Sequence, residues 1–127
     1  MFAVTFNADI LALVDISTEA VTKIEVGAVP AQFYVQPDNR FAYVANQGTE
    51  ESPSRTVSKI DLETKKVAAT IETGDGAHGL ITSPDLAQLY VTNIYENALS
   101  GYPVQSSDCH STNRRNVERR NDYTVKQ

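Results

Sequence analysis

Short apolar segments separated by turn residues run along the first hundred residues of the chain. Within residues 66–73, Val67, Ala69 and Ile71 alternate with small or polar residues, which is the two-residue period of a half-buried β-strand. Other segments are rich in aromatic and β-branched residues. They lie at 2–5, 10–15, 20–26, 31–36, 41–46, 56–61, 79–83 and 88–93, with a short one near Leu99. No competing helical segment is long enough, so we predict an all-β protein with ten strands.

The pattern repeats along the chain. Three sequence features return after 47 residues: YVAN at 43–46 as YVTN at 90–93, Pro37-Asp38 as Pro84-Asp85, and Gly27 as Gly74. Four strands in about 45 residues is the composition of one four-stranded antiparallel blade of a β-propeller. We therefore predict a partial β-propeller of about two and a half blades, whereas a closed ring has about four to eight.

Residues that favour turns separate the predicted strands. Asp15 and Asp61 each lie between two strands, where a short carboxylate can accept backbone N–H bonds. Asn39 can adopt a left-handed conformation in a turn. Gly27 and Gly74 each end a strand, and we expect these glycines to permit a sharp change of direction. These residues are expected to build the fold and not a catalytic site.

The repeated residues resemble the YVTN family of β-propeller repeats over about residues 1–102. The residues that carry the resemblance are Val14-Asp15-x-x-Thr18, Val26-Gly27-x-x-Pro30, Pro37-Asp38, Tyr43-Val44-x-Asn46 and Tyr90-Val91-Thr92-Asn93. The last of these matches the tetrapeptide of the family name in full. The family includes archaeal surface-layer proteins and exported bacterial propellers, and it is similar to the propeller domain of haem-containing nitrite reductases.

This resemblance implies a non-enzymatic binding module or cell-surface scaffold, which belongs to a longer propeller. The alternative is an enzyme-type propeller, lactonase-like or haem-reductase-like, whose active residues lie in missing blades. A fold alone does not decide between the two. We favour the non-enzymatic role, because no convergent set of catalytic residues is visible in the sequence and no cofactor is predicted.

The composition changes near residue 104. Residues 1–103 hold the repeats, whereas residues 104–127 are polar and lack an apolar period, so we expect them to form a disordered tail. Because no strand that could close the ring is predicted in this tail, we interpret the chain as a fragment of a longer propeller. The other interpretation is that several copies assemble into one ring through their open blade edges.

Charge and composition exclude several classes of partner. The chain has 11 Lys and Arg against 16 Asp and Glu, a net charge of −5, which argues against nucleic-acid binding. No apolar run approaches the roughly 20 residues of a membrane span, and one Cys excludes a disulfide framework. The first residues lack the pattern of a secretory signal peptide, although intact members of the family are usually exported. The expected partner is an unidentified protein or small molecule.

His78 is the candidate ligand-binding residue. It lies in the segment 74–79 at the start of a predicted innermost strand, which would place it at the face near the central channel. Ala31 occupies the equivalent position one repeat earlier, so the repeat itself does not require a histidine. In the haem-bearing relatives, histidines near this face attend the cofactor, and the resemblance extends this role to His78 alone.

Two other patterns carry no predicted site. Gly74-x-Gly76-x-x-Gly79 fits the dinucleotide-binding pattern, but that pattern works by opening a helix, and a strand is predicted to follow here. Cys109-His110 has residue types that bind metals, yet no second pair lies at a suitable spacing. We therefore predict no metal site and no catalytic residue.

Overall fold

The computed structural model describes residues 2–6, 8–104 and 121–124, and within them it contains eleven β-strands and no helix. The strands are β1 Phe2–Phe6, β2 Ile10–Val14, β3 Val21–Glu25, β4 Pro30–Val35, β5 Phe41–Gly48, β6 Pro53–Asp61, β7 Lys66–Glu72, β8 Ala77–Thr82, β9 Gln88–Asn93, β10 Ala98–Pro103 and β11 Asn121–Thr124. Each of the ten predicted segments corresponds to one of β1–β10, so the all-β prediction is confirmed.

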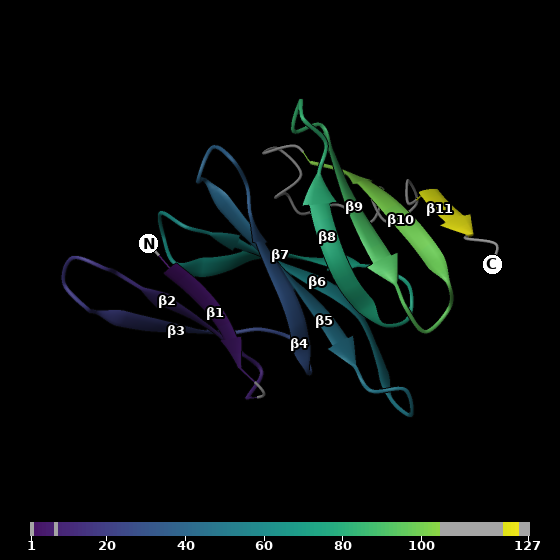
Figure 1. The fold of residues 1–127 in the computed structure, drawn as a ribbon, viewed down its shortest axis with the longest axis horizontal. Helices are drawn as coiled ribbons and strands as arrows, with labels where there is room; N and C mark the ends of the chain where they lie inside the picture. Colours follow the sequence, from purple (N-terminus) through teal and green to yellow (C-terminus); the bar gives the residue numbers. More distant parts are fainter. Residues whose placement is uncertain (1, 7, 105–120, 125–127) are drawn as a thin grey trace.

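The strands form three antiparallel sheets in the order of the sequence. Their strand orders are β1-β2-β3, β4-β5-β6-β7 and β8-β9-β10-β11. Figure 1 shows the three sheets side by side, with β4–β7 in the middle. The strand β4 lies against both β1 and β8, which are the first strands of the neighbouring sheets. Sheets that radiate in this way are the blades of a partial propeller.

The strand β11 corrects one expectation of the sequence analysis. Asn121–Thr124 pairs antiparallel with Ala98–Gly101 of β10, although the segment 104–127 was expected to supply no strand. An unpaired edge of β10 would leave backbone N–H and C=O groups without partners, and the Tyr and Thr of this segment favour extended backbone. The rest of the predicted tail, 105–120 and 125–127, lies outside the described residues.

The middle sheet packs against a hydrophobic core on each of its faces. Alternate residues of β5 pack in opposite directions, with Tyr43 facing one neighbouring sheet and Val44 facing the other. One core lies between the first and middle sheets and contains Leu11, Leu13, Ile24, Ala42, Val44 and Ile60. The other lies between the middle and last sheets and contains Phe41, Tyr43, Ala45, Val57, Ala77, Leu80, Leu89, Val91 and Tyr102. Two cores of the same construction are what repeated blades require.

The predicted turn residues have the expected roles. Asp61 Oδ1 accepts the backbone N–H of Glu63 at 2.8 Å, and Asp15 Oδ1 accepts that of Ser17 at 3.0 Å. The Ser17 side chain also donates to this carboxylate at 2.7 Å, and this bond is the main reason why the pKa of Asp15 lies below its ordinary value. Asn39 has a φ of 58°, as expected for a left-handed turn residue.

Gly27 and Gly74 lie at bends of the chain, as expected. Among the described residues, the glycines with left-handed φ are Gly48 and Gly76, so a left-handed backbone is not what requires a glycine at 27 and 74. Instead, the backbone N–H of Gly27 donates to Asn46 Oδ1 at 3.0 Å. A Cβ atom on Gly27 would lie 2.6 Å from Asn46 Cγ, so the glycine is needed for the close approach of the asparagine.

The asparagine of the repeated tetrapeptide joins consecutive blades. Asn46 is fully buried and donates through Nδ2 to Thr56 Oγ1 at 3.0 Å and to Ser58 Oγ at 3.1 Å. One repeat later, Asn93 Oδ1 accepts the N–H of Gly74 at 3.2 Å, and Asn93 also donates to a serine hydroxyl. Each asparagine therefore satisfies its own polar atoms while it fixes the connection from the preceding blade.

Candidate functional site

His78 lies in a β-bulge at the start of β8. The pairing of β8 with β9 shifts between Ala77 and Leu80, so that the ladder is interrupted at His78. The strand β4 has the same irregularity at its own start, where Ala31 is the extra residue. Bulges turn a side chain away from its regular direction and are frequent beside binding sites. The bulge therefore belongs to the repeat, whereas the imidazole is particular to this blade.

Hydrogen bonds connect His78 to the neighbouring sheet. His78 Nδ1 lies 2.7 Å from Oε1 of Gln47, which is near the end of β5. Gln47 Nε2 in turn donates to the hydroxyl of Tyr95 at 2.8 Å. The imidazole is exposed, whereas Gln47 and Tyr95 are half-buried. The three side chains thus form one connected polar group across the junction of two blades.

The bulge is held by a hydroxyl group. The backbone N–H of Gly79 donates to Thr92 Oγ1 at 2.9 Å, and Ala45, which has no hydroxyl, stands one repeat before Thr92. A Cβ atom on Gly79 would lie 3.4 Å from Oε1 of Gln32, so the Gln32 side chain also lies next to the bulge. The groups that gather here are uncharged hydrogen-bonding side chains.

Charged residues lie on the connection that leads to the bulge. Asp75 forms an ion pair with Arg55, and the backbone N–H of Asp75 donates to Glu96 Oε1 at 2.9 Å. Two carboxylates and one guanidinium therefore flank this side of His78.

The sequence analysis found His78 but missed Gln47 and Tyr95. Both residues follow the repeated tetrapeptide, Gln47 directly after Asn46 and Tyr95 two residues after Asn93. Their contacts span 31 residues from Gln47 to His78 and 48 residues from Gln47 to Tyr95, so no local pattern reveals them. The signal available in the sequence was that neither residue recurs: Ile94 is equivalent to Gln47, and Gly48 is equivalent to Tyr95.

The other candidate patterns have simple outcomes. Gly74 and Gly76 precede strand β8 and Gly79 lies within it, with no helix following, so the dinucleotide pattern lacks the structural context that it needs. No group of three or more His, Cys, Asp or Glu that could hold a metal occurs in residues 2–6, 8–104 and 121–124. Cys109-His110 lies outside the described residues. The part of the chain that is described contains no helix long and apolar enough to cross a membrane.

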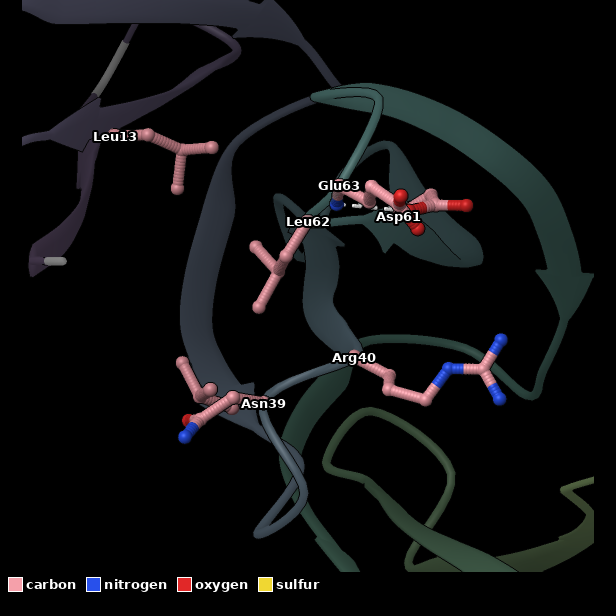
Figure 2. Close-up of a pocket in the computed structure, with 7 residues that line it drawn as sticks. Leu13, Asn39, Arg40, Asp61, Leu62 and Glu63 are labelled. Carbon is pink, nitrogen blue, oxygen red and sulfur yellow. Dashed lines mark hydrogen bonds between the residues drawn. The ribbon is translucent and has the colours of Figure 1, made fainter.

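A cleft of about 470 Å³ opens between the first and middle sheets. It is lined by Leu13, Val35, Asn39, Arg40, Asp61, Leu62 and Glu63. Figure 2 shows the charged groups of Arg40, Asp61 and Glu63 extending away from Leu13. The cleft lies at the end of β4 and β6 that is remote from His78, since Val35 ends β4 and Asp61 ends β6.

The cleft reflects a difference between two repeats. Leu13 lines it, and the equivalent residue 46 positions later is Lys59. Lys59 is only 4% exposed, and its Nζ lies 4.2 Å from the centre of the Phe41 ring. A long side chain therefore packs over an aromatic ring at the second junction, where the first junction has the shorter Leu13.

Comparison with known proteins gives the fold. No protein-family model and no curated protein matches the chain. Among solved structures, it is similar to hydrazine synthase from Kuenenia stuttgartiensis, with a TM-score of 0.65 and 24% identity over 80% of this chain and 29% of that chain. It is also similar to AztD from Citrobacter koseri, with a TM-score of 0.66 and 16% identity over 82% of this chain and 29% of that one.

A third similar structure is a putative 6-phosphogluconolactonase from Bacteroides fragilis. The TM-score is 0.65 and the identity 13%, over 94% of this chain and 34% of that chain. The chain thus spans about a third of the length of the structures that it matches. All three are β-propeller-like proteins, and at these identities the likeness shows the fold alone: the chain has the architecture of a partial β-propeller.

Proposed function

We propose that the chain is part of a YVTN-type β-propeller and serves as a non-enzymatic binding or surface-scaffold module, with His78 facing its ligand. One observation carries the proposal. In a repeat protein, residues that the fold needs recur in each repeat, as Asn46 and Asn93 do. His78, Gln47 and Tyr95 do not recur, yet they contact one another. A group of residues that the fold does not require is best explained by a function.

The chemistry of this group favours an uncharged, hydrogen-bonding ligand. The side chains beside the bulge are amides, hydroxyls and an imidazole, and the carboxylate of Asp75 on the connection before it is paired with Arg55. Hydroxyl-rich molecules can both donate to and accept from such groups. The amides and hydroxyls carry no positive charge that would pair with an anion.

An NMR titration of the isotopically labelled chain tests this proposal. The probes are D-glucose, which is neutral and rich in hydroxyls, and inorganic phosphate. We expect glucose to shift the amide resonances of Gly79 and Thr92, and we expect His78→Ala to abolish these shifts while Ile81→Ala, on the same strand, leaves them intact. Equal shifts in His78→Ala, a stronger response to phosphate, or no response to glucose would overturn the proposal.

The second candidate is an enzyme-type propeller, lactonase-like or haem-reductase-like, whose active residues lie in further blades. It is supported by the similar structures, which include a putative 6-phosphogluconolactonase and a hydrazine synthase. The described residues supply a single imidazole, that of His78, which could act as one axial ligand of a haem held by further blades. Hydrolysis of gluconolactone, or a haem absorbance shift, that is found in a protein with further blades and not in this chain by itself would favour this candidate.

A further inference from the structure

The Gln47 carboxamide lies between the side chains of His78 and Tyr95. Its Oε1 atom faces His78 Nδ1 at 2.7 Å, and its Nε2 atom donates to the Tyr95 hydroxyl at 2.8 Å. An amide oxygen can only accept a hydrogen bond, so with the amide in this orientation Nδ1 is the donor. A neutral imidazole has one N–H group, and Nε2 is then left with a lone pair.

We propose that Gln47 is a positioning residue, which fixes His78 as the Nδ1–H tautomer and presents Nε2 as the acceptor for a hydroxyl or N–H donor of the ligand. This inference rests on the proposed function, in which His78 faces the ligand. The imidazole is exposed, and no hydrogen bond to its Nε2 is found among the described residues. The ligand class is therefore narrowed from hydrogen-bonding molecules to those that donate a hydrogen bond at this point.

A compensating exchange of residues makes room for Tyr95. A Cβ atom on Gly76 would lie 2.9 Å from Tyr95 Cγ, so a side chain at position 76 would displace the aromatic ring. One repeat earlier, Val29 stands in place of Gly76 and Gly48 stands in place of Tyr95. The bulky residue of this contact is therefore Tyr95 in one repeat and Val29 in the other.

The backbone on both sides of this contact is also fixed. The N–H of Tyr95 donates to the carbonyl of Asp75 at 3.1 Å, and the N–H of Ile94 donates to the carbonyl of Gly76 at 2.9 Å. These bonds hold the backbone of Tyr95 against the connection before β8. The Tyr95 hydroxyl therefore has a defined position from which it accepts the hydrogen bond of Gln47.

The tautomer can be measured directly by NMR. Long-range ¹H–¹⁵N correlation spectra of the intact chain are recorded without ligand at about pH 9, where an ordinary imidazole is neutral. The chain has two histidines, and His78→Ala identifies the signals of His78. We expect a protonated Nδ1 and an unprotonated Nε2. A protonated Nε2 would overturn the inference, since it requires the Gln47 amide to be turned the other way.

Two variants at position 47 separate a positioning role from simple packing. Gln47→Leu removes the acceptor, and we expect the Nδ1–H population of His78 to fall. Gln47→Glu restores an acceptor and should restore the Nδ1–H tautomer. Equal tautomer populations in wild type and Gln47→Leu would refute the positioning role.

The glucose titration distinguishes failure of this inference from failure of the proposed function. We expect Gln47→Leu to weaken glucose binding about fivefold, which corresponds to one hydrogen bond. A fixed tautomer with no response to glucose would refute the binding proposal and leave the positioning of His78 intact. A response to glucose with Nε2 protonated would refute the positioning role and leave the binding site intact.

Discussion

Alanine at position 27 tests why a glycine stands at the connection between two blades. Its Cβ atom would lie 2.6 Å from Asn46 Cγ, and overpacking of this kind costs about 1–3 kcal/mol. Asn46→Ala removes three hydrogen bonds, with Gly27, Thr56 and Ser58. At about 1 kcal/mol for each bond, the free energy of unfolding should fall by about 3 kcal/mol.

The double variant is the decisive case. Once Asn46 is alanine, the clash with a Cβ at position 27 is gone and the hydrogen bond from Gly27 is already lost. We therefore expect the combined loss to be smaller than the sum of the single losses by at least about 1 kcal/mol, as is typical of residues in contact. Gly74→Ala combined with Asn46→Ala is the matched control, which should be additive because this glycine meets Asn93 and Glu96 instead.

Urea unfolding gives the four free energies. The chain has no Trp and six Tyr, so circular dichroism or tyrosine fluorescence serves as the probe. Additive losses for Gly27→Ala and Asn46→Ala would refute the reasoning. They would mean that Gly27 is needed for its own backbone conformation, independently of the asparagine.

Three further predictions concern single residues. Leu86 has a φ of 59°, a region that disfavours branched side chains, so Leu86→Gly should raise the free energy of unfolding by up to about 1 kcal/mol in a urea titration. The Ser83 hydroxyl is the main group that holds the pKa of Asp85 below its ordinary value. The stability that this carboxylate contributes is therefore present at neutral pH and is lost as the pH falls from about 5 through the lowered pKa. Thermal unfolding at pH 7 and pH 3 should show a smaller loss of stability on acidification for Asp85→Asn than for wild type. Tyr43→Phe removes the buried bond to Gln36 Oε1, 2.9 Å long, and should cost about 1 kcal/mol by the same urea assay, whereas no loss would show that this bond is dispensable.

Local features of the fold were predictable from the sequence, because they depend on neighbouring residues. The alternation of Val67, Ala69 and Ile71 marks β7, and the turn at Asp61 follows from a carboxylate two residues before a free N–H group. The purpose of Gly27 was not predictable, since its partner Asn46 is 19 residues away. The strand β11 was also missed, because pairing through the backbone with β10 leaves no apolar period in the sequence.

The candidate site was predictable only in part. His78 stood out because the repeat does not require it, but Gln47 and Tyr95 depend on how two sheets meet. A comparison of repeats reveals positions that differ, and the structure then shows which of these positions contact one another. Both steps were needed to assemble the group around the bulge.

We propose that repeated residues build the fold, whereas the non-repeated residues at the bulge serve another purpose. The most direct test compares the free energies of unfolding of His78→Ala and Asn93→Ala, two variants in the same sheet. Asn93 is buried and bonded to Gly74 and Ser100, so its loss should cost about 2 kcal/mol. His78 is exposed, and His78→Ala should change the free energy of unfolding by less than about 0.5 kcal/mol. An equal loss for His78→Ala would contradict the account, since His78 would then be one more structural residue of the blade.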